Sequence, residues 1–333
     1  MKKVLTWDQR FAEINAMRQR FAVVMSDLIR ENDNIALVLA DITAERFSDV
    51  LSDFPDRVIN VGIREQLMID MTGGLALSGM RPFAHTFASF LIERPFEQIK
   101  IALNHQNVGA VLVSAGASYD LSVDGRTHQS PADVALLNTL ADWNIIIPGN
   151  AEEAEYALRM AASDTGLYYI RLSTETNKQT YWSGENGFTV LKSGHQGTVI
   201  AVGPVADRVL ASTEDLDVTV LYTPVITPFD TATLRKTLSV PDIAIVEPYL
   251  EGTSAHSISK ALSDIPHRLL SIGVKRQELR QFGTPEEHIR AHGLDTPGLK
   301  ERLSVFYHRL KRRTKNAKAF HDKCENGLST QGV

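Results

Sequence analysis

The sequence predicts an α/β protein of two domains, each a mainly parallel sheet covered by helices. Short apolar runs rich in β-branched residues recur without polar alternation, which is typical of strands buried on both faces of a sheet. Longer helical patterns separate these runs, as expected where helices connect parallel strands. At 333 residues the chain is long enough for two hydrophobic cores.

The first predicted domain covers residues 18–185, after a lead-in of residues 1–17. Its strands are expected at residues 35–41, 57–62, 108–116, 143–148 and 167–173. Its helices are expected at residues 18–30, 65–79, 92–104, 130–141 and 151–163. A polar, glycine-containing stretch at residues 173–187 is typical of a linker.

The second predicted domain covers residues 191–310 and repeats the alternation on a smaller scale. Its strands are expected at residues 197–203, 217–224, 242–248 and 268–274. The tail at residues 311–333 is basic and then polar, with few residues suited to a core. We therefore expect this tail to be flexible.

Composition narrows the class of protein. A formal net charge of −5 gives no general reason to expect nucleic acid or an anionic membrane as a partner. Cys324 is the only cysteine, which excludes an intrachain disulfide and suits a reducing compartment. The first residues lack a signal-peptide core, and no segment approaches the roughly 20 apolar residues that span a bilayer. We expect a soluble, cytoplasmic protein.

Three segments of the first domain are candidates for a functional site. The segments are "GIREQ" at 62–66, "PFAHTFASF" at 82–90 and "DGRTHQSP" at 124–131. Taken singly, each has an ordinary structural explanation. Glu65 would be a charge at a helix N-terminus, Phe83, Phe87 and Phe90 would form an apolar stripe on a core-facing helix, and Ser130 would cap a helix. Their common order in one domain is harder to explain by structure alone.

Together with "GGLALSG" at 73–79 and "RLS" at 171–173, these segments resemble the transketolase family of thiamine diphosphate enzymes. The resemblance runs from about residue 18 to about residue 310. It covers the pyrimidine-binding domain and the carboxyl-terminal domain of the family. It therefore implies that the two predicted domains have these two folds.

The resemblance implies a catalytic role for Glu65. Its match in the family hydrogen-bonds N1′ of the cofactor's aminopyrimidine ring. A carboxyl that shares a proton with N1′ favours the imino tautomer, whose exocyclic nitrogen can take the proton from thiazolium C2. The resulting carbanion is the cofactor's own reactivity, and the protein supplies orientation and electrostatics.

Other cofactor contacts are implied in the same way. Phe87 and Phe90 match aromatic residues around the pyrimidine, where ring faces form a dry wall. Asp41 matches an aspartate near the positively charged thiazolium, where a carboxylate is electrostatically favoured.

The substrate contacts implied by the family come from several segments. Asp124 and His128 match residues that hydrogen-bond substrate hydroxyls, and His128 is the better candidate for moving protons because imidazole titrates near neutrality. Arg18 and Arg171 match arginines that hold a sugar phosphate, a task suited to the guanidinium fork.

Four positions depart from the common sugar-phosphate enzymes. Glu45 stands where they have a serine near the phosphate, and a carboxylate there would repel an anionic substrate. Glu93 replaces a third aromatic residue, and Gly116 or a neighbouring residue replaces a histidine that holds the donor's hydroxyls. His85 replaces a glycine, so its imidazole either enters the substrate pocket or is a hydrogen-bonded residue of the wall.

The family's diphosphate-binding signature is absent from this sequence. That signature is Gly-Asp-Gly, and it marks the domain that grips the diphosphate and a divalent metal through oxygen ligands. We therefore expect this chain to hold no metal. A separate amino-terminal, diphosphate-binding subunit would hold Mg²⁺ or Ca²⁺ and complete an α2β2 heterotetramer.

The function that follows is one subunit of a split transketolase in carbohydrate metabolism, inactive without its partner. It would transfer a two-carbon ketol unit from a ketose or ketose phosphate to an aldose. One alternative is a thiamine diphosphate subunit like deoxyxylulose-phosphate synthase or like the β subunit of a 2-oxo-acid dehydrogenase. The segment "LIERPFEQI" is also similar to the corresponding helix of deoxyxylulose-phosphate synthase. Another is a non-catalytic regulatory homologue.

Overall fold

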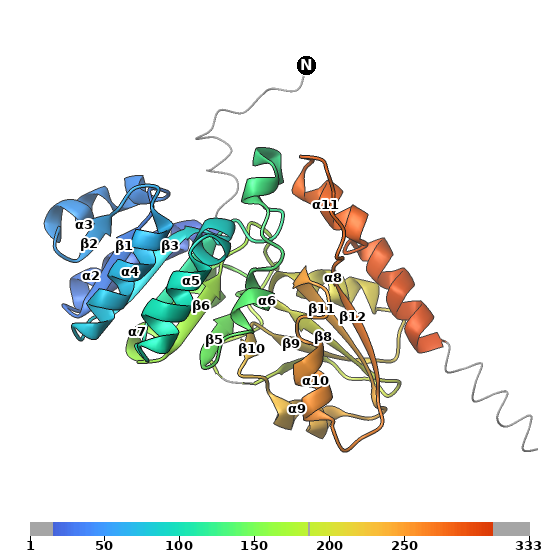
Figure 1. The fold of residues 1–333 in the computed structure, drawn as a ribbon. Helices are drawn as coiled ribbons and strands as arrows, with labels where there is room; N and C mark the ends of the chain where they lie inside the picture. The colour runs from blue at the N-terminus through green and yellow to red at the C-terminus, as the bar shows by residue number, and fades with distance from the viewer. Residues whose placement is uncertain (1–15, 186, 309–333) are drawn as a thin grey trace, which may run out of the picture.

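The computed structural model describes residues 16–185 and 187–308 (Figure 1). It contains a seven-stranded sheet of order β10-β5-β6-β4-β3-β1-β2 and a five-stranded sheet of order β12-β11-β8-β9-β7. Among the paired strands, β10 with β5 and β7 with β9 are antiparallel, and the other pairs are parallel. The predicted α/β class is confirmed. The tail at 311–333 and most of the lead-in lie outside the described residues.

The first sheet uses six strands from residues 35–171 and one short strand from later in the chain. The six are β1 (Ile35–Leu39), β2 (Val58–Asn60), β3 (Arg81–Phe87), β4 (Val111–Ala115), β5 (Trp143–Ile146) and β6 (Leu167–Arg171). The seventh strand, β10 (Val225–Thr227), pairs with the edge of β5. The chain therefore returns to the first sheet after it has entered the second.

Helices cover both faces of this sheet because its strands alternate two sets of apolar side chains. Leu37 and Phe83 face the core that includes α2 and α7, whereas Val38 and Ala84 face the core that includes α4 and α6. The helices of the first half are α2 (Ala16–Glu31), α3 (Ser48–Asp53), α4 (Glu65–Leu77), α5 (Phe96–Gln98), α6 (Asp133–Leu137) and α7 (Ala151–Ser163).

The second sheet lies in the yellow-to-orange part of Figure 1 and is covered in the same way. Its strands are β7 (Thr189–Lys192), β8 (Thr198–Val202), β9 (Thr219–Thr223), β11 (Asp242–Leu250) and β12 (Arg268–Val274). The surrounding helices are α8 (Ala206–Ser212), α9 (Thr231–Thr237), α10 (Ala255–Ala261), α11 (Pro285–His292) and a final helix at residues 296–308. Among the helices that the structure describes, none has the length and apolarity needed to cross a bilayer.

Two local expectations about the site segments are wrong. Phe83 and Phe87 belong to strand β3, so the helical-stripe explanation of these phenylalanines fails. Both face the protein interior because central strands of a parallel sheet are buried on both faces. Ser130 does not cap a helix: α6 starts only at Asp133, and the Ser130 hydroxyl donates to Glu93 at 2.9 Å.

The predicted helix at residues 92–104 is also different in detail. It consists of π-helical turns at Ser89–Glu93 and Ile99–His105 around the short α5. Such π-helical turns often occur at functional sites.

Candidate functional site

The candidate site is built at the carboxyl ends of neighbouring parallel strands. In the order β2-β1-β3-β4, the chain leaves β2 toward Glu65, leaves β1 at Asp41, and ends β3 at Phe87. Ligands of open α/β sheets bind at this edge, because the loops that follow adjacent strands meet there.

Asn60 ties two of these strand ends together. Its side-chain oxygen accepts hydrogen bonds from the backbone N–H groups of Asp41 and Gly62, each at 3.0 Å. Asp41 has a left-handed backbone with φ of 69°, and its side chain is exposed. The carboxylate that the sequence assigns to the thiazolium therefore lies at the surface of this chain, on a fixed backbone.

Glu65 is buried and paired. It is the first residue of α4 and only 2% exposed. The Arg94 guanidinium donates a hydrogen bond to its Oε1 oxygen at 2.7 Å, which satisfies a carboxylate that burial would otherwise penalise. Sequence reasoning missed Arg94, although a charged residue between an apolar helical segment and Pro95 was a usable signal.

A cluster of aromatic rings extends from this ion pair. The Phe90 ring centroid lies 6.2 Å from that of Phe87 and 5.0 Å from that of His128, and the Phe87 and His128 centroids are 5.8 Å apart. The guanidinium carbon of Arg94 lies 4.0 Å from the Phe90 centroid, which is cation–π distance. The fold thus brings together three separate sequence segments around Glu65.

His128 and Asp124 lie on the loop between β4 and β5, and both are half-buried. The loop consists of 3₁₀ turns at Ser122–Asp124 and Arg126–His128, joined by Gly125. Gly125 has φ of 88°, and a Cβ atom there would lie 2.6 Å from the Phe282 ring, so a side chain would be both strained and crowded.

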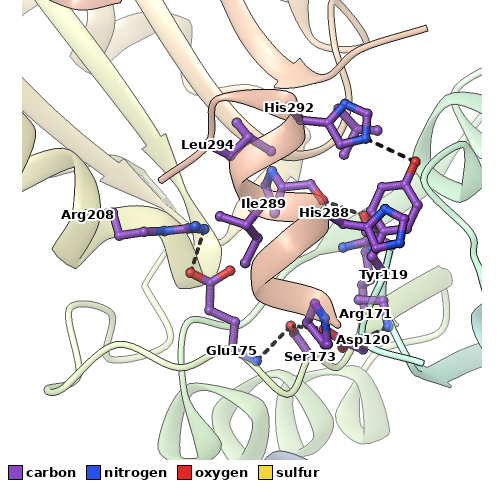
Figure 2. Close-up of a pocket in the computed structure, with 15 residues that line it drawn as sticks. Tyr119, Asp120, Arg171, Ser173, Glu175, Arg208, His288, Ile289, His292 and Leu294 are labelled. Carbon is purple, nitrogen blue, oxygen red and sulfur yellow. Dashed lines mark hydrogen bonds and ion pairs between the residues drawn. The ribbon is translucent and has the colours of Figure 1, made fainter. Parts of the chain in front are cut away.

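The loop is held by the second half of the chain. Arg126 pairs with Glu278 at 3.0 Å, and the Ser122 hydroxyl donates to the Gly283 carbonyl oxygen at 3.1 Å. Figure 2 shows the cavity of about 40 Å³ between the start of this loop and α11. There Tyr119 stacks on His288 with ring centroids 4.1 Å apart. The loop that carries His128 is therefore held by the later segment at Glu278 and Gly283.

Arg18 is held by a buried chain of hydrogen bonds. The Val113 carbonyl oxygen can only accept, so His85 donates to it from Nδ1 at 2.8 Å. Neutral His85 then accepts at Nε2 from the Thr43 hydroxyl at 2.8 Å, and that hydroxyl accepts from Arg18 Nε at 2.8 Å. His85 has no exposed surface, so the geometry supports a positioning role through Arg18 rather than direct contact with a substrate.

The surroundings of Arg18 contain both an aromatic ring and a carboxylate. Its guanidinium carbon lies 5.9 Å from the centroid of Phe87, and its Nη2 lies 4.0 Å from Glu45. Arg18 is 4% exposed and Glu45 is 68% exposed. Burial, more than the Glu45 carboxylate can offset, lowers the pKa of Arg18 to about 10, so the group remains a cation at neutral pH.

His85 should make the protein sensitive to acid. Burial, and then the positive charge of Arg18, lower the pKa of His85 to about 3 from its ordinary 6.5. The folded state therefore binds fewer protons than the unfolded state between these values. The contribution of His85 to the free energy of unfolding is complete above pH 6.5. As the pH falls toward 3, this contribution is lost at about 1.4 kcal/mol per pH unit.

Denaturant unfolding of wild type and His85→Gln between pH 7 and pH 5 measures this effect. We expect the free energy of unfolding to fall more steeply with acid in wild type than in His85→Gln. His195→Gln, at a residue that is 89% exposed, should keep the wild-type slope. Equal slopes for wild type and His85→Gln would show that His85 is not held neutral.

Arg171 is placed differently from Arg18. Its Nε donates to Asp133 at 2.6 Å, its Nη2 donates to Ser118 at 2.7 Å, and its side chain is 1% exposed. Tyr169 donates to the same Asp133 oxygen at 2.6 Å. Burial would lower the pKa of Arg171, but Asp133, Tyr169 and Asp120 together outweigh burial and the pKa is raised. The internal partners of this guanidinium support a structural role beside the phosphate role predicted from sequence.

Comparison with known proteins identifies the family. A profile described as "Transketolase, pyrimidine binding domain" matches residues 15–179. An "Uncharacterized 33.6 kDa protein in fasciation locus" from Rhodococcoides fascians is 46% identical over 290 residues, covering 86% of this chain and 93% of that protein. A solved structure described as "Split gene transketolase, inactive beta4 tetramer" is 25% identical, with a TM-score of 0.74, covering 88% of this chain and 98% of that one.

The chain belongs to the transketolase family. A further relative, an apulose-4-phosphate transketolase subunit from Actinobacillus succinogenes, is 26% identical over 301 residues, covering 86% of this chain and 95% of that protein. Transketolase membership implies use of thiamine diphosphate. The site residues from Arg18 to Arg171 all fall within the matched pyrimidine-binding segment.

The residues at the candidate site fit the aminopyrimidine half of this cofactor. A buried carboxyl can bind a ring nitrogen, and the Phe87 and Phe90 rings can pack against a flat aromatic face. Two buried donors have no hydrogen-bond partner within the described residues: Ser89 Oγ, next to Phe90 in sequence, and Gln129 Nε2, next to His128. Buried polar groups are normally satisfied, so this edge is chemically suited to a polar, planar ligand.

Proposed function

We propose that this chain is the pyrimidine-binding subunit of a split transketolase. It transfers a two-carbon ketol unit from a ketose donor to an aldose acceptor and works in an α2β2 assembly with a diphosphate-binding subunit that holds Mg²⁺. This proposal is supported by the length of its relatives: the chain spans 95% of a relative named as one subunit of a transketolase and 98% of a split-gene transketolase chain.

The observation that carries the proposal is the buried Glu65 carboxyl among aromatic rings and His128. When bound, thiamine diphosphate supplies the carbon nucleophile that accepts the ketol unit. Glu65 shares a proton with the ring nitrogen, and Phe87 and Phe90 exclude water from the ring. Asp41 favours the positive charge of the thiazolium.

The substrate is handled by residues of other segments. His128 and Asp124 hydrogen-bond its hydroxyl groups, and His128 moves a proton at the hydroxyl beside the reacting carbon. Arg18, positioned by Thr43 and His85, binds an anionic end such as a phosphate. The neighbouring Glu45 weakens this attraction, but its exposed carboxylate is screened by solvent more than the buried Arg18 charge. A relative named for a sugar phosphate supports an anionic substrate.

Calorimetric titration with thiamine diphosphate tests the split assembly. The chain purified by itself should bind the cofactor weakly or not at all, because the groups for the diphosphate and its metal are assigned to the partner. Adding the diphosphate-binding subunit should restore binding, make it Mg²⁺-dependent and give ketol transfer. Tight, metal-dependent binding by the isolated chain would rule out the split-subunit proposal.

A further inference from the structure

The Arg94 side chain makes two contacts that a bound aminopyrimidine ring would also need. Its Nη1 donates to Glu65 Oε1 at 2.7 Å, and its guanidinium carbon lies 4.0 Å from the Phe90 centroid. A guanidinium is a planar group with hydrogen-bond donors at its edge. In shape and hydrogen bonding it resembles a protonated nitrogen heterocycle.

These contacts cannot be shared. The guanidinium already occupies Oε1 of the 2% exposed Glu65 and lies over the Phe90 ring, so a planar ring bound to the same oxygen and the same ring face would take its place. We propose that Arg94 is a self-ligand: in the cofactor-free chain its guanidinium occupies the place of the aminopyrimidine ring, and the cofactor binds only by displacing it. This inference rests on the proposed function, because it assumes that Glu65 and Phe90 bind the ring.

The burial of the two partners determines which one moves. Arg94 is 37% exposed and Glu65 is 2% exposed. The arginine can turn into water at small cost, whereas an unpaired Glu65 would be strongly penalised. The ring must therefore arrive as the guanidinium leaves, so that Glu65 always has a partner.

The local backbone allows this exchange. Arg94 follows the π-helical turn at Ser89–Glu93, where its N–H donates to the Ser89 carbonyl oxygen at 3.3 Å, and it precedes Pro95. The backbone is thus fixed on both sides while the long side chain is free to rotate. Exchange then needs only a side-chain movement, and the backbone that carries Phe90 stays in place.

The consequence is that Arg94 sets the affinity for the ring. If the charge-assisted hydrogen bond between Arg94 and Glu65 must break before the ring binds, it weakens ring binding by about 10- to 100-fold. Removing the guanidinium should therefore tighten ring binding by about 10- to 100-fold. An arginine that instead held the ring would have the opposite effect.

Thiamine is the probe, because it carries the aminopyrimidine without the diphosphate that the partner subunit would hold. Its binding to the full isolated chain is measured by calorimetry or ligand-observed NMR, with circular dichroism to confirm folding. We expect Arg94→Ala to bind thiamine about 10- to 100-fold more tightly than wild type. Arg94→Met should do the same, since it fills the space of the arginine stem but has no donor.

Two control variants locate the effect. Arg94→Ala combined with Glu65→Gln should lose most of the gain, because the carboxylate released by Arg94 is then missing. Arg159→Ala removes a partly exposed arginine of α7, one that pairs with Glu155 away from the site, and should leave thiamine affinity unchanged. Unchanged or weaker thiamine binding by both Arg94→Ala and Arg94→Met would overturn the self-ligand.

The two proposals fail separately. If the assembled subunits bind thiamine diphosphate with Mg²⁺ but the Arg94 variants gain no affinity for thiamine, only the self-ligand is wrong. If the assembled subunits do not bind thiamine diphosphate, the proposed function is wrong whatever the thiamine titrations show.

Discussion

Glu65→Gln is expected to lower kcat of the assembled enzyme by about 10²–10⁴-fold, the range typical of general acid–base groups. Glutamine keeps the shape of the side chain but cannot share a proton with a ring nitrogen. Folding should be nearly unaffected, because the amide can still accept from Arg94, whose guanidinium is partly exposed. Steady-state kinetics and thermal unfolding of the same preparation separate the two effects.

Asp70→Asn is the matched control for this experiment. Asp70 lies on the same helix, α4, and its side chain is exposed. It should leave kcat unchanged. Activity of Glu65→Gln close to wild type in the assembled complex would remove Glu65 from the mechanism.

Breaking the Arg171–Asp133 pair is expected to cost about 3–5 kcal/mol of folding free energy, because either single variant leaves a charge buried without its partner. Both side chains are at most 1% exposed, and their ion pair measures 2.6 Å. We therefore expect Arg171→Met and Asp133→Leu each to destabilise the protein strongly. The double variant should recover much of the loss, since an apolar pair of similar size replaces the ion pair. Denaturant unfolding of the four proteins measures this cycle.

Kinetics then distinguish the structural role of Arg171 from phosphate binding. Arg18→Ala should raise KM for an anionic donor by about 10- to 100-fold, the value of a charge-assisted contact, and spare a short uncharged donor. Arg171→Met should affect both donors equally. A selective rise in KM for the anionic donor with Arg171→Met would instead support the phosphate role predicted from its sequence match.

Much of the fold was predictable because burial patterns are local. Continuous apolar runs marked β1, β4, β5 and β6, and the helical periodicity at residues 151–163 matched α7 within its observed bounds. The pattern failed at Phe83 and Phe87. Spacings of four and three suit a helix, but in a central strand buried on both faces every position can be apolar, so spacing carries no information there.

Sequence patterns were enough to predict the family, the two-sheet α/β class and the segments that supply Glu65, Phe87, Phe90 and His128 to one edge. Which polar groups pair with one another could be seen only in the folded chain. Arg94 reaches Glu65 across 29 positions, Thr43 reaches His85 across 42, and Arg171 reaches Asp133 across 38. Such pairs depend on the order of strands in the sheet and on the exact turn that ends a helix. The free energy of each pair is set by burial, which no local sequence pattern specifies.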